Sequence, residues 1–365
     1  MVLEKLSDSL KETIRKVNGL RKFWKILRDR VGRVFDKIKI ERKGHLFPKL
    51  VLPKPPRRKS VALPDNYYAS VAYAGQKVLE EVTMIVCKKL FAITRCQNIA
   101  IAGGVGLNID ANTRIINETG FKRIFIQPAA SDCGIPFGAA LYGYHCLLQK
   151  PRFFTMDHAY LGRPYSDKEI EEAIRERSDE ITDRISSEVA KETAKLIADG
   201  KIVGWFQGGS EYGPRALGHR SILADARHPS MRDIVNRRVK HREMWRPFAA
   251  SVLKEHSQDF FDLKEESPFM ILLSNVRQEK RDKIPSVVHV DGTCRIQTVT
   301  KEANGIYHDL IREFHKITEV PLLLNTSFNL GGEPIVETPN DALKSFLNTD
   351  MDYLVLGNYI VQKKV

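Results

Sequence analysis

The most informative segment of the sequence spans residues 204–252 and reads GWFQGGSEYGPRALGHRSILADARHPSMRDIVNRRVKHREMWRPFAASV. An apolar strand runs into a glycine turn, and basic residues then recur at irregular intervals: Arg215, Arg220, Lys240, Arg242 and Arg246. Glycines let a main chain approach phosphate oxygens, and guanidinium groups bind those oxygens in pairs. The pattern predicts a phosphate or nucleotide site, with an ordinary turn beside a solvated basic face as the alternative.

Length and composition indicate a globular protein of two domains. The chain has 365 residues, of which 42% are hydrophobic. No apolar run approaches the roughly 18 residues that a membrane span needs, and no signal-peptide core is visible at the amino terminus. The five cysteines form no C-x-x-C pair, which argues against a disulfide framework and a zinc knuckle. These features predict a cytoplasmic protein.

The net charge of +13 is concentrated in one segment. Residues 1–60 hold 19 lysines and arginines against 6 acidic residues, and residues 61–365 hold 39 of each sign. Because the body of the chain is neutral, no direct contact with nucleic acid is expected.

The same segment carries a helical pattern. Apolar residues recur at three- and four-residue steps from Leu3 to Ile38, flanked by basic residues, and predict an amphipathic helix. Three interpretations stay open: a helix docked on its own body or a partner, contact of residues 1–40 with a membrane surface, or a solvated connector. Prolines among basic residues between Pro48 and Lys59 predict a stiff extended linker.

Helical and strand patterns then alternate. Helices are expected over residues 66–90, 112–117 and 139–143, and strands over 99–102 and 123–127. Alternating elements imply an α/β layer with binding loops at the strand ends, such as Gly103-Gly104. The pattern breaks near residues 150–165, and a capping box at Ser166 and Glu169 opens the next helix. A strand over 201–206, a helix over 339–348 opened by Thr338-Pro339, and a strand-like run over 353–361 follow.

Several long segments resemble the O-carbamoyltransferases, the family of the nodulation, cephalosporin and aminoglycoside carbamoyltransferases. SEYGPRALGHRSILADAR, VKHREMWRPFAAS and PLLLNTSFNLGGEPIV are similar to its carboxy-terminal YrdC-like domain. NIAIAGGVGLNIDANTRI and IFIQPAASDCGIPFGAALYG are similar to the second half of its sugar-kinase/actin-like domain. The resemblance runs from about Pro64 to about Lys364. It implies an α/β fold: a partial sugar-kinase/actin-like domain over 61–155, then a YrdC-like α/β domain over 156–365, both after the basic segment 1–60.

The resemblance implies a reaction. In the family, carbamoyl phosphate and ATP give carbamoyl-adenylate, and the carbamoyl group passes to a hydroxyl of a small-molecule acceptor. Arg215, Lys240 and Arg246 are the expected catalytic residues, because cations can neutralise phosphate while an anionic oxygen attacks phosphorus. The expected substrate- and nucleotide-binding residues are Ser327, Asn329, Arg220, Asn108, Gly103 and Gly104.

Two further expectations concern loops. Asn325 to Asn329 follows the apolar run 322–324 and is expected to be a polar loop at a strand end, with a plain Asx or ST turn as the alternative. Asp132 is the expected ligand of a divalent metal, Mg or Fe, on phosphate oxygens, and a helix cap is the alternative.

One departure from the family is visible. Its kinase-like domain normally begins with a half that carries a paired-histidine metal motif, and no such motif precedes residue 64. We therefore expect a protein partner that supplies this half, or a gene fragment, or a repurposed protein. Alternatives to a carbamoyltransferase are a non-catalytic interaction subunit or truncated remnant, and a threonylcarbamoyl-adenylate synthase-like enzyme.

Overall fold

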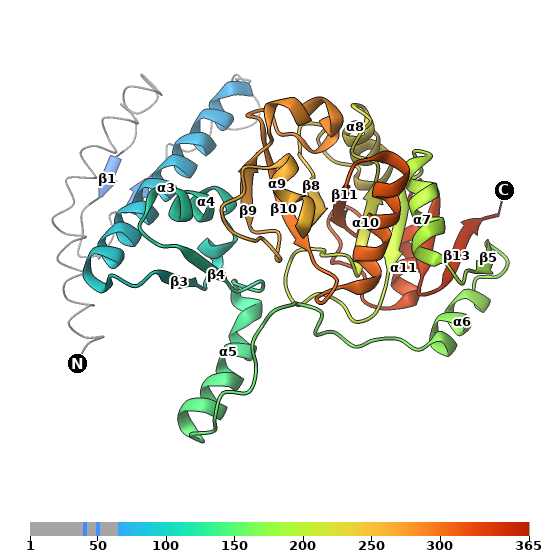
Figure 1. Cartoon of the computed structure of the whole chain (residues 1–365), viewed down its shortest axis with the longest axis horizontal. Coiled ribbons are helices and arrows are strands. Elements are labelled where there is room, and N and C mark those ends of the chain that lie inside the picture. The colour runs from blue at the N-terminus through green and yellow to red at the C-terminus, as the bar shows by residue number, and fades with distance from the viewer. Residues whose placement is uncertain (1–38, 42–48, 52–64, 365) are drawn as a thin grey trace. The chain divides into compact units, whose positions relative to one another are not determined.

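The computed structural model describes residues 39–41, 49–51 and 65–364 of the chain (Figure 1). Its contacts separate two compact units, Met1–Thr94 and Arg95–Val365. The predicted boundary at residue 60 falls inside the first unit and that at residue 155 inside the second, and both stay predictions. The amphipathic helix expected over residues 3–38 lies outside the described residues, as does most of the expected linker.

The described residues of the first unit form one long helix and a short strand pair. Strand β1 (Lys39–Glu41) pairs antiparallel with β2 (Lys49–Val51), and α3 spans Asp65–Thr94, which confirms the helix expected from residue 66. Met84 and Cys87 of α3 are buried, and so is the carboxylate of Glu80. Lys77 compensates that carboxylate one turn earlier, with Nζ 2.8 Å from Oε2.

The second unit begins with a small parallel layer. Strand β3 (Asn98–Ile101) pairs with β4 (Arg123–Ile126), and α4 (Ile109–Glu118) and α5 (Ile135–Tyr142) follow them in turn. Asn108 caps α4 by accepting a hydrogen bond from the Ala111 N–H at 3.0 Å. The Asn112 amide donates to the Ile271 carbonyl at 3.1 Å, so the layer is tied to the large sheet of the same unit.

A nine-stranded mixed sheet forms the body of the second unit. Its order is β5-β13-β12-β6-β7-β11-β8-β10-β9, and the pairs β12/β6 and β8/β10 are parallel whereas the rest are antiparallel. The strands are β5 (Ile181–Ile185), β6 (Val203–Phe206), β7 (Arg220–Ala224), β8 (Ala249–Leu253), β9 (Leu272–Asn275), β10 (Thr293–Val299), β11 (Leu322–Ser327), β12 (Tyr353–Leu356) and β13 (Tyr359–Lys363). The helices are α6 (Asp167–Arg175), α7 (Val189–Ala198), α8 (Met231–Val235), α9 (Ser257–Phe260), α10 (Gly305–Thr318) and α11 (Pro339–Leu347). Figure 1 shows α7 and α10 side by side.

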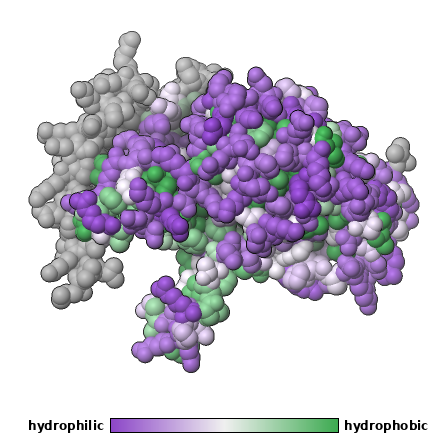
Figure 2. All heavy atoms as spheres, in the orientation of Figure 1, coloured by the Kyte–Doolittle hydropathy of each residue, from purple (hydrophilic) through white to green (hydrophobic). Residues whose placement is uncertain are grey.

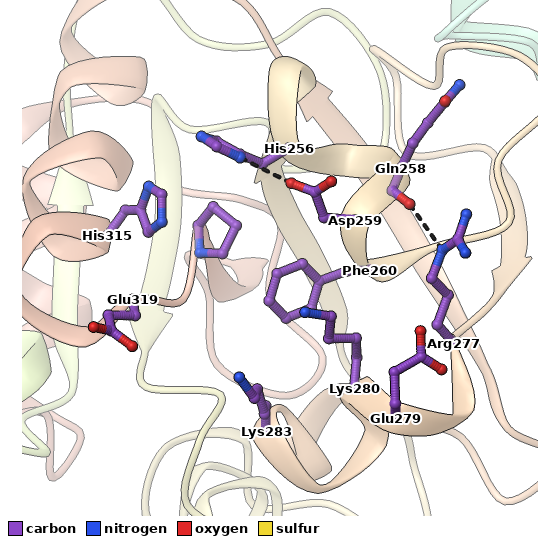
Figure 3. A pocket seen from close by; sticks show the side chains of 11 residues that line it. His256, Gln258, Asp259, Phe260, Arg277, Glu279, Lys280, Lys283, His315 and Glu319 are labelled. Atoms are coloured by element: carbon purple, nitrogen blue, oxygen red, sulfur yellow. Dashed lines mark hydrogen bonds and ion pairs between the residues drawn. The ribbon is translucent and has the colours of Figure 1, made fainter.

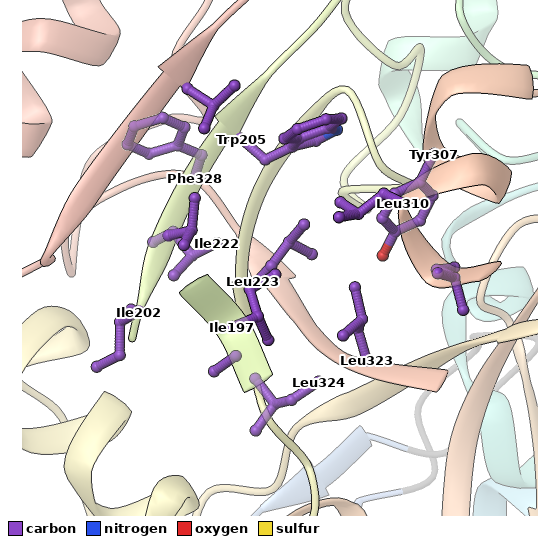
Figure 4. Close-up of a cluster of buried hydrophobic side chains, with 14 of the residues drawn as sticks. Ile197, Ile202, Trp205, Ile222, Leu223, Tyr307, Leu310, Leu323, Leu324 and Phe328 are labelled. Carbon is purple, nitrogen blue, oxygen red and sulfur yellow. The ribbon is translucent and has the colours of Figure 1, made fainter. Parts of the chain in front are cut away.

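The core of this unit lies on the central strands. Trp205, Leu223, Leu324 and Phe328 are fully buried, and Figure 4 shows them gathered with Tyr307 of α10. Each such side chain stabilises the fold by about 1.5–3 kcal/mol relative to exposure. The indole of Trp205 donates to the Gly218 carbonyl at 2.9 Å, so the core also anchors the loop that follows β6.

Two sequence expectations need correction. The run 353–361 is a hairpin rather than one strand, because Gly357 turns the chain with a φ of 54° between β12 and β13. The segment 325–327 belongs to β11 rather than to a loop, and Asn325 is buried in the sheet. Polar residues are tolerated there because the Asn325 amide donates to the Ala216 carbonyl at 3.2 Å and to Ser251 Oγ at 2.9 Å.

The surface is mostly hydrophilic in the view of Figure 2, with hydrophobic side chains along α5, where Ile135 and Tyr142 are exposed. All five cysteines are free thiols. Within the described ranges, no helix combines the length and apolar character needed to cross a membrane.

The capping box predicted at Ser166 is present, and the cap predicted at Thr338 proves to be a second capping box, which gives a stability test. Thr338 Oγ1 accepts from the Asp341 N–H at 3.1 Å, and Asp341 Oδ2 accepts from the Thr338 N–H at 2.9 Å. We expect Thr338→Ala to lower the free energy of unfolding by about 1 kcal/mol in urea titrations. Thr338→Ser keeps the hydroxyl and is expected to lose much less. An equal loss in both variants would contradict a capping role.

Candidate functional site

A cavity of about 290 Å³ in the second unit, called here the arginine cavity, is lined by four arginines from three segments of the chain. Arg215 comes from the loop between β6 and β7, Arg242 and Arg246 follow the short π-helix Asn236–Lys240, and Arg295 lies on β10. No aspartate or glutamate is among the residues that line this cavity. Three of the catalytic and binding residues expected from the sequence, Arg215, Arg246 and Ser327, therefore meet at one site.

The charges of this cluster are largely uncompensated. Within the described part of the chain, the four arginines make one ion pair, Arg246 Nε to Glu243 Oε2 at 2.8 Å. The Nε atoms of Arg215 and Arg295 are buried without a hydrogen-bond partner. Burial, and then the charge of Arg215, lowers the pKa of Arg295 to about 9. Buried cations without acidic partners are costly, and an anionic ligand would relieve that cost.

Arg242 is held in place at the cavity wall. Its Nε donates to Asn236 Oδ1 at 2.7 Å, and its guanidinium lies 4.8 Å from the ring centroid of Phe248. Burial, and then the charge of Arg246, lowers the pKa of Arg242. Its planar group is therefore oriented before any ligand arrives.

Lys240 lies directly behind the cavity and is 4% exposed. Its Nζ donates to the carbonyl and Oγ of Ser327 at 2.6 and 3.2 Å, and to the carbonyl and Oδ1 of Asn329 at 3.0 and 2.8 Å. All four acceptors are neutral oxygens. Burial, and then the charge of Arg242, lowers the pKa of the ammonium to about 7. Ser327 lines the cavity, so the lysine charge is one side chain away from a bound ligand.

Arg220, expected to bind substrate, has a different position. It is fully buried, and its guanidinium stacks 3.5 Å from the ring centroid of Phe206. It donates to the carbonyl oxygens of Gln207, Gly208, His219 and Glu337 at 2.6 to 3.3 Å. These contacts hold the glycine turn together, and Arg220 does not line the cavity.

The expected binding residues of the small layer also lie outside the cavity lining. Gly103 and Gly104 are exposed at the end of β3, with Gly103 at a φ of 94°. Asn108 acts as the cap of α4, and its neighbour Ile109 reaches the cavity wall.

Asp132 is exposed at the start of a single 3₁₀ turn after β4. Among the residues that the structure describes, no group of three histidine, cysteine, aspartate or glutamate side chains is placed to hold a metal ion. The described residues therefore do not fit the metal expected at Asp132, since a divalent cation needs several oxygen or nitrogen ligands.

Sequence reasoning missed three residues of the cavity. Arg295 interrupts an otherwise uncharged strand, TCRIQTV, and that interruption is the signal that could have identified it. His289 lines the cavity with a pKa that burial lowers. Trp245 also lines it and is 73% exposed, an unusual state for the largest apolar side chain.

A second cavity of about 540 Å³ lies between α9 and the end of α10 (Figure 3). Its cations stand beside carboxylates: His256 Nδ1 is 3.0 Å from Asp259 Oδ2, and Glu279 and Glu319 also line it. Because the charges are mixed and no expected site residue is present, this cavity is a weaker candidate than the arginine cavity, although it is larger.

Two family models match the chain. The model described as carbamoyltransferase N-terminus matches residues 1–141, and that described as carbamoyltransferase C-terminus matches residues 194–363. The first match corrects the expectation that the resemblance begins near Pro64, because it extends to residue 1.

Relatives with similar sequences were also found. The nodulation protein NolNO of Sinorhizobium fredii is 40% identical over 346 residues, which cover 93% of this chain and 48% of the relative. An uncharacterised protein of Synechocystis sp. is 40% identical over 334 residues, which cover 84% of this chain and 54% of the relative. The chain thus spans about half the length of the curated relatives it matches. Among solved structures, full-length HypF in the phosphate- and nucleotide-bound form gives a TM-score of 0.33 at 17% identity, over 48% of this chain and 22% of that chain, which is too low to support an argument.

The lowered pKa of Lys240 gives a pH test. A lysine in the unfolded chain titrates near about 10.4, whereas Lys240 in the fold titrates at about 7. Between these values the unfolded state binds more protons, so folding becomes more favourable as the pH rises. We expect the free energy of unfolding of the wild type, relative to Lys240→Met, to increase from about pH 7 to about pH 10 and to be constant below pH 7. Denaturant titrations across this range measure it, and a constant difference throughout would show that Lys240 is not desolvated.

Proposed function

Because the chain belongs to the carbamoyltransferase family, we propose that its second unit binds ATP and carbamoyl phosphate in the arginine cavity and forms carbamoyl-adenylate there. The carbamoyl group would then pass to a hydroxyl of a small-molecule acceptor. The observation that supports the proposal is the convergence of Arg215, Arg242, Arg246 and Arg295 on a cavity whose described lining has no carboxylate. The chain spans about half the length of its relatives, so transfer of the carbamoyl group to the acceptor is proposed here in the same way as formation of the adenylate.

The first step needs charge neutralisation more than covalent help. Water hydrolyses carbamoyl phosphate by breaking the bond between phosphorus and the bridging oxygen, which gives phosphate and carbamate. A carbamate oxygen then forms a bond to the α-phosphorus of ATP while the bond from that phosphorus to pyrophosphate breaks. Negative charge collects on the phosphate oxygens throughout, and fixed cations in a water-poor cavity stabilise it. Arg215 and Arg295 have buried Nε atoms that are free to donate, so each can bind oxygens without first breaking a protein contact.

Arg246 and Lys240 would have different tasks. Arg246 is exposed and paired with Glu243, so it can exchange that carboxylate for a phosphate at the cavity mouth. Lys240 is fixed behind Ser327 and supplies charge without moving. In the second step the acceptor oxygen attacks the carbamoyl carbon, and the bond between that carbon and the adenylate oxygen breaks, with AMP as the leaving group.

Binding of the two phosphorylated substrates tests the proposal directly. We expect calorimetry on the full chain to detect binding of ATP and of carbamoyl phosphate, and Arg246→Ala to weaken the binding of each by about 1.5–3 kcal/mol, the range for a hydrogen bond to a charged group. Lys240→Ala should also weaken binding, but by less, because its charge acts from behind Ser327. Arg277→Ala, which removes the same charge from the second cavity, serves as the control. Wild-type affinity in both Lys240→Ala and Arg246→Ala would exclude this cavity as the site.

Trp245 allows the base of ATP to be separated from its phosphates. An exposed indole beside a cationic cavity suits stacking on adenine, an interaction of about 1–3 kcal/mol per base. We expect Trp245→Ala to weaken the binding of ATP while leaving the binding of inorganic tripolyphosphate nearly unchanged. Trp245→Phe should retain most of the affinity for ATP. Equal weakening of both ligands by Trp245→Ala would mean that the indole does not contact the base.

A further inference from the structure

One carboxylate oxygen of Glu211 accepts hydrogen bonds from main-chain N–H groups at the end of the loop that carries Arg215. Its Oε1 accepts hydrogen bonds from the N–H groups of Leu217, His219 and Arg220, at 2.7, 2.8 and 3.2 Å. Its Oε2 is buried without a partner among the described residues. Because one oxygen accepts all three hydrogen bonds, it holds the main chain of residues 217–220 in place, shortly after Arg215.

The carbonyl groups of the same loop are fixed from the other side. The Ala216 carbonyl accepts from the Asn325 amide at 3.2 Å, and the Leu217 carbonyl accepts from the Gln297 amide at 2.7 Å and the Tyr160 hydroxyl at 2.8 Å. Glu211 therefore completes a set of contacts that leaves the residues after Arg215 with one conformation. The side chain of Arg215 itself has no comparable support, since its Nε is buried and unpartnered.

Glu211 also keeps its charge away from Arg215. Within the described residues no ion pair joins the two side chains, and the only cause that lowers the pKa of Arg215 is burial. A carboxylate paired with Arg215 would neutralise it and compete with phosphate. A carboxylate that binds main-chain N–H groups through Oε1 can order the loop while the guanidinium stays available.

We infer that Glu211 is a positioning residue for Arg215: it holds the 212–220 loop so that the guanidinium reaches the anion without a further ordering cost. This rests on the proposed function, because it assigns Arg215 to the bound phosphate. Pre-organised groups bind more tightly than groups that must be ordered on binding, and small displacements of a binding group cost affinity. No local sequence pattern predicts this role, because the three N–H donors lie six to nine residues further along the chain.

A double-mutant cycle tests the inference. We expect Glu211→Ala to raise the Kd for ATP about tenfold in calorimetry, and to have no further effect in an Arg215→Ala background, since its influence passes through Arg215. Glu279→Ala, which removes an exposed carboxylate from the second cavity, is the charge control and should leave the Kd unchanged. An equal rise in both backgrounds, or no rise in either, would overturn the inference.

Two further measurements keep the outcome decisive. If Glu211→Ala does not fold, Glu211→Asp replaces it: the shorter side chain withdraws the carboxylate oxygen from the three N–H groups. A rise in Kd confined to the Arg215-containing background then supports the inference, and an unchanged Kd contradicts it. If the wild type binds neither ATP nor carbamoyl phosphate, the proposed function fails. Trypsin cleavage of the Arg215–Ala216 bond, followed by mass spectrometry, then decides the loop-holding role, because faster cleavage in the Glu211 variants supports it and an unchanged rate excludes it.

Discussion

Burial of positive charge against neutral oxygens is the constraint around which the second unit is organised. Lys240 meets four oxygens and Arg220 meets four carbonyl groups, yet none of these acceptors carries a charge. Neutral acceptors satisfy the geometry of the donors without cancelling their charge. The surrounding strands and turns must therefore be rigid enough to hold cations near one another. The positive potential of the unit is retained, whereas carboxylate partners would have cancelled it.

Two arginines near the end of the loop between β6 and β7 have different environments. The guanidinium of Arg220 donates hydrogen bonds to main-chain carbonyl groups of the turn. Arg215, five residues earlier, lines the cavity and has an Nε without a hydrogen-bond partner. Glu211 accepts hydrogen bonds from the N–H groups of Leu217 and Arg220, between and beside these two positions. An arginine that binds the main chain and an arginine that lines the cavity are thus parts of the same loop.

What the sequence could predict follows the range of the interactions involved. The capping box at Ser166 and the helix start at Thr338-Pro339 are local features, and both were predicted from short sequence patterns, although the reciprocal bond of Asp341 was not. The strand character of residues 325–327 was missed because it depends on pairing with β7 and β8, distant segments that no local pattern reports. Arg295 was missed for the same reason: its place in the cavity is set by β10 lying beside β8. The assignment of Arg215, Lys240 and Arg246 to one site came from the family resemblance rather than from their spacing.

The order of strands in the large sheet has a consequence for how the chain is made. Strand β5 pairs only with β13, whose residues are translated long after it, and β6 has β12 as its parallel neighbour. Until β12 and β13 have been synthesised, β5 therefore has no strand partner and β6 lacks its parallel neighbour. Pairings of such long sequence separation form slowly, and open edges invite association with other chains. Nascent chains of this protein should accordingly be most prone to association before the hairpin of β12 and β13 inserts between β5 and β6.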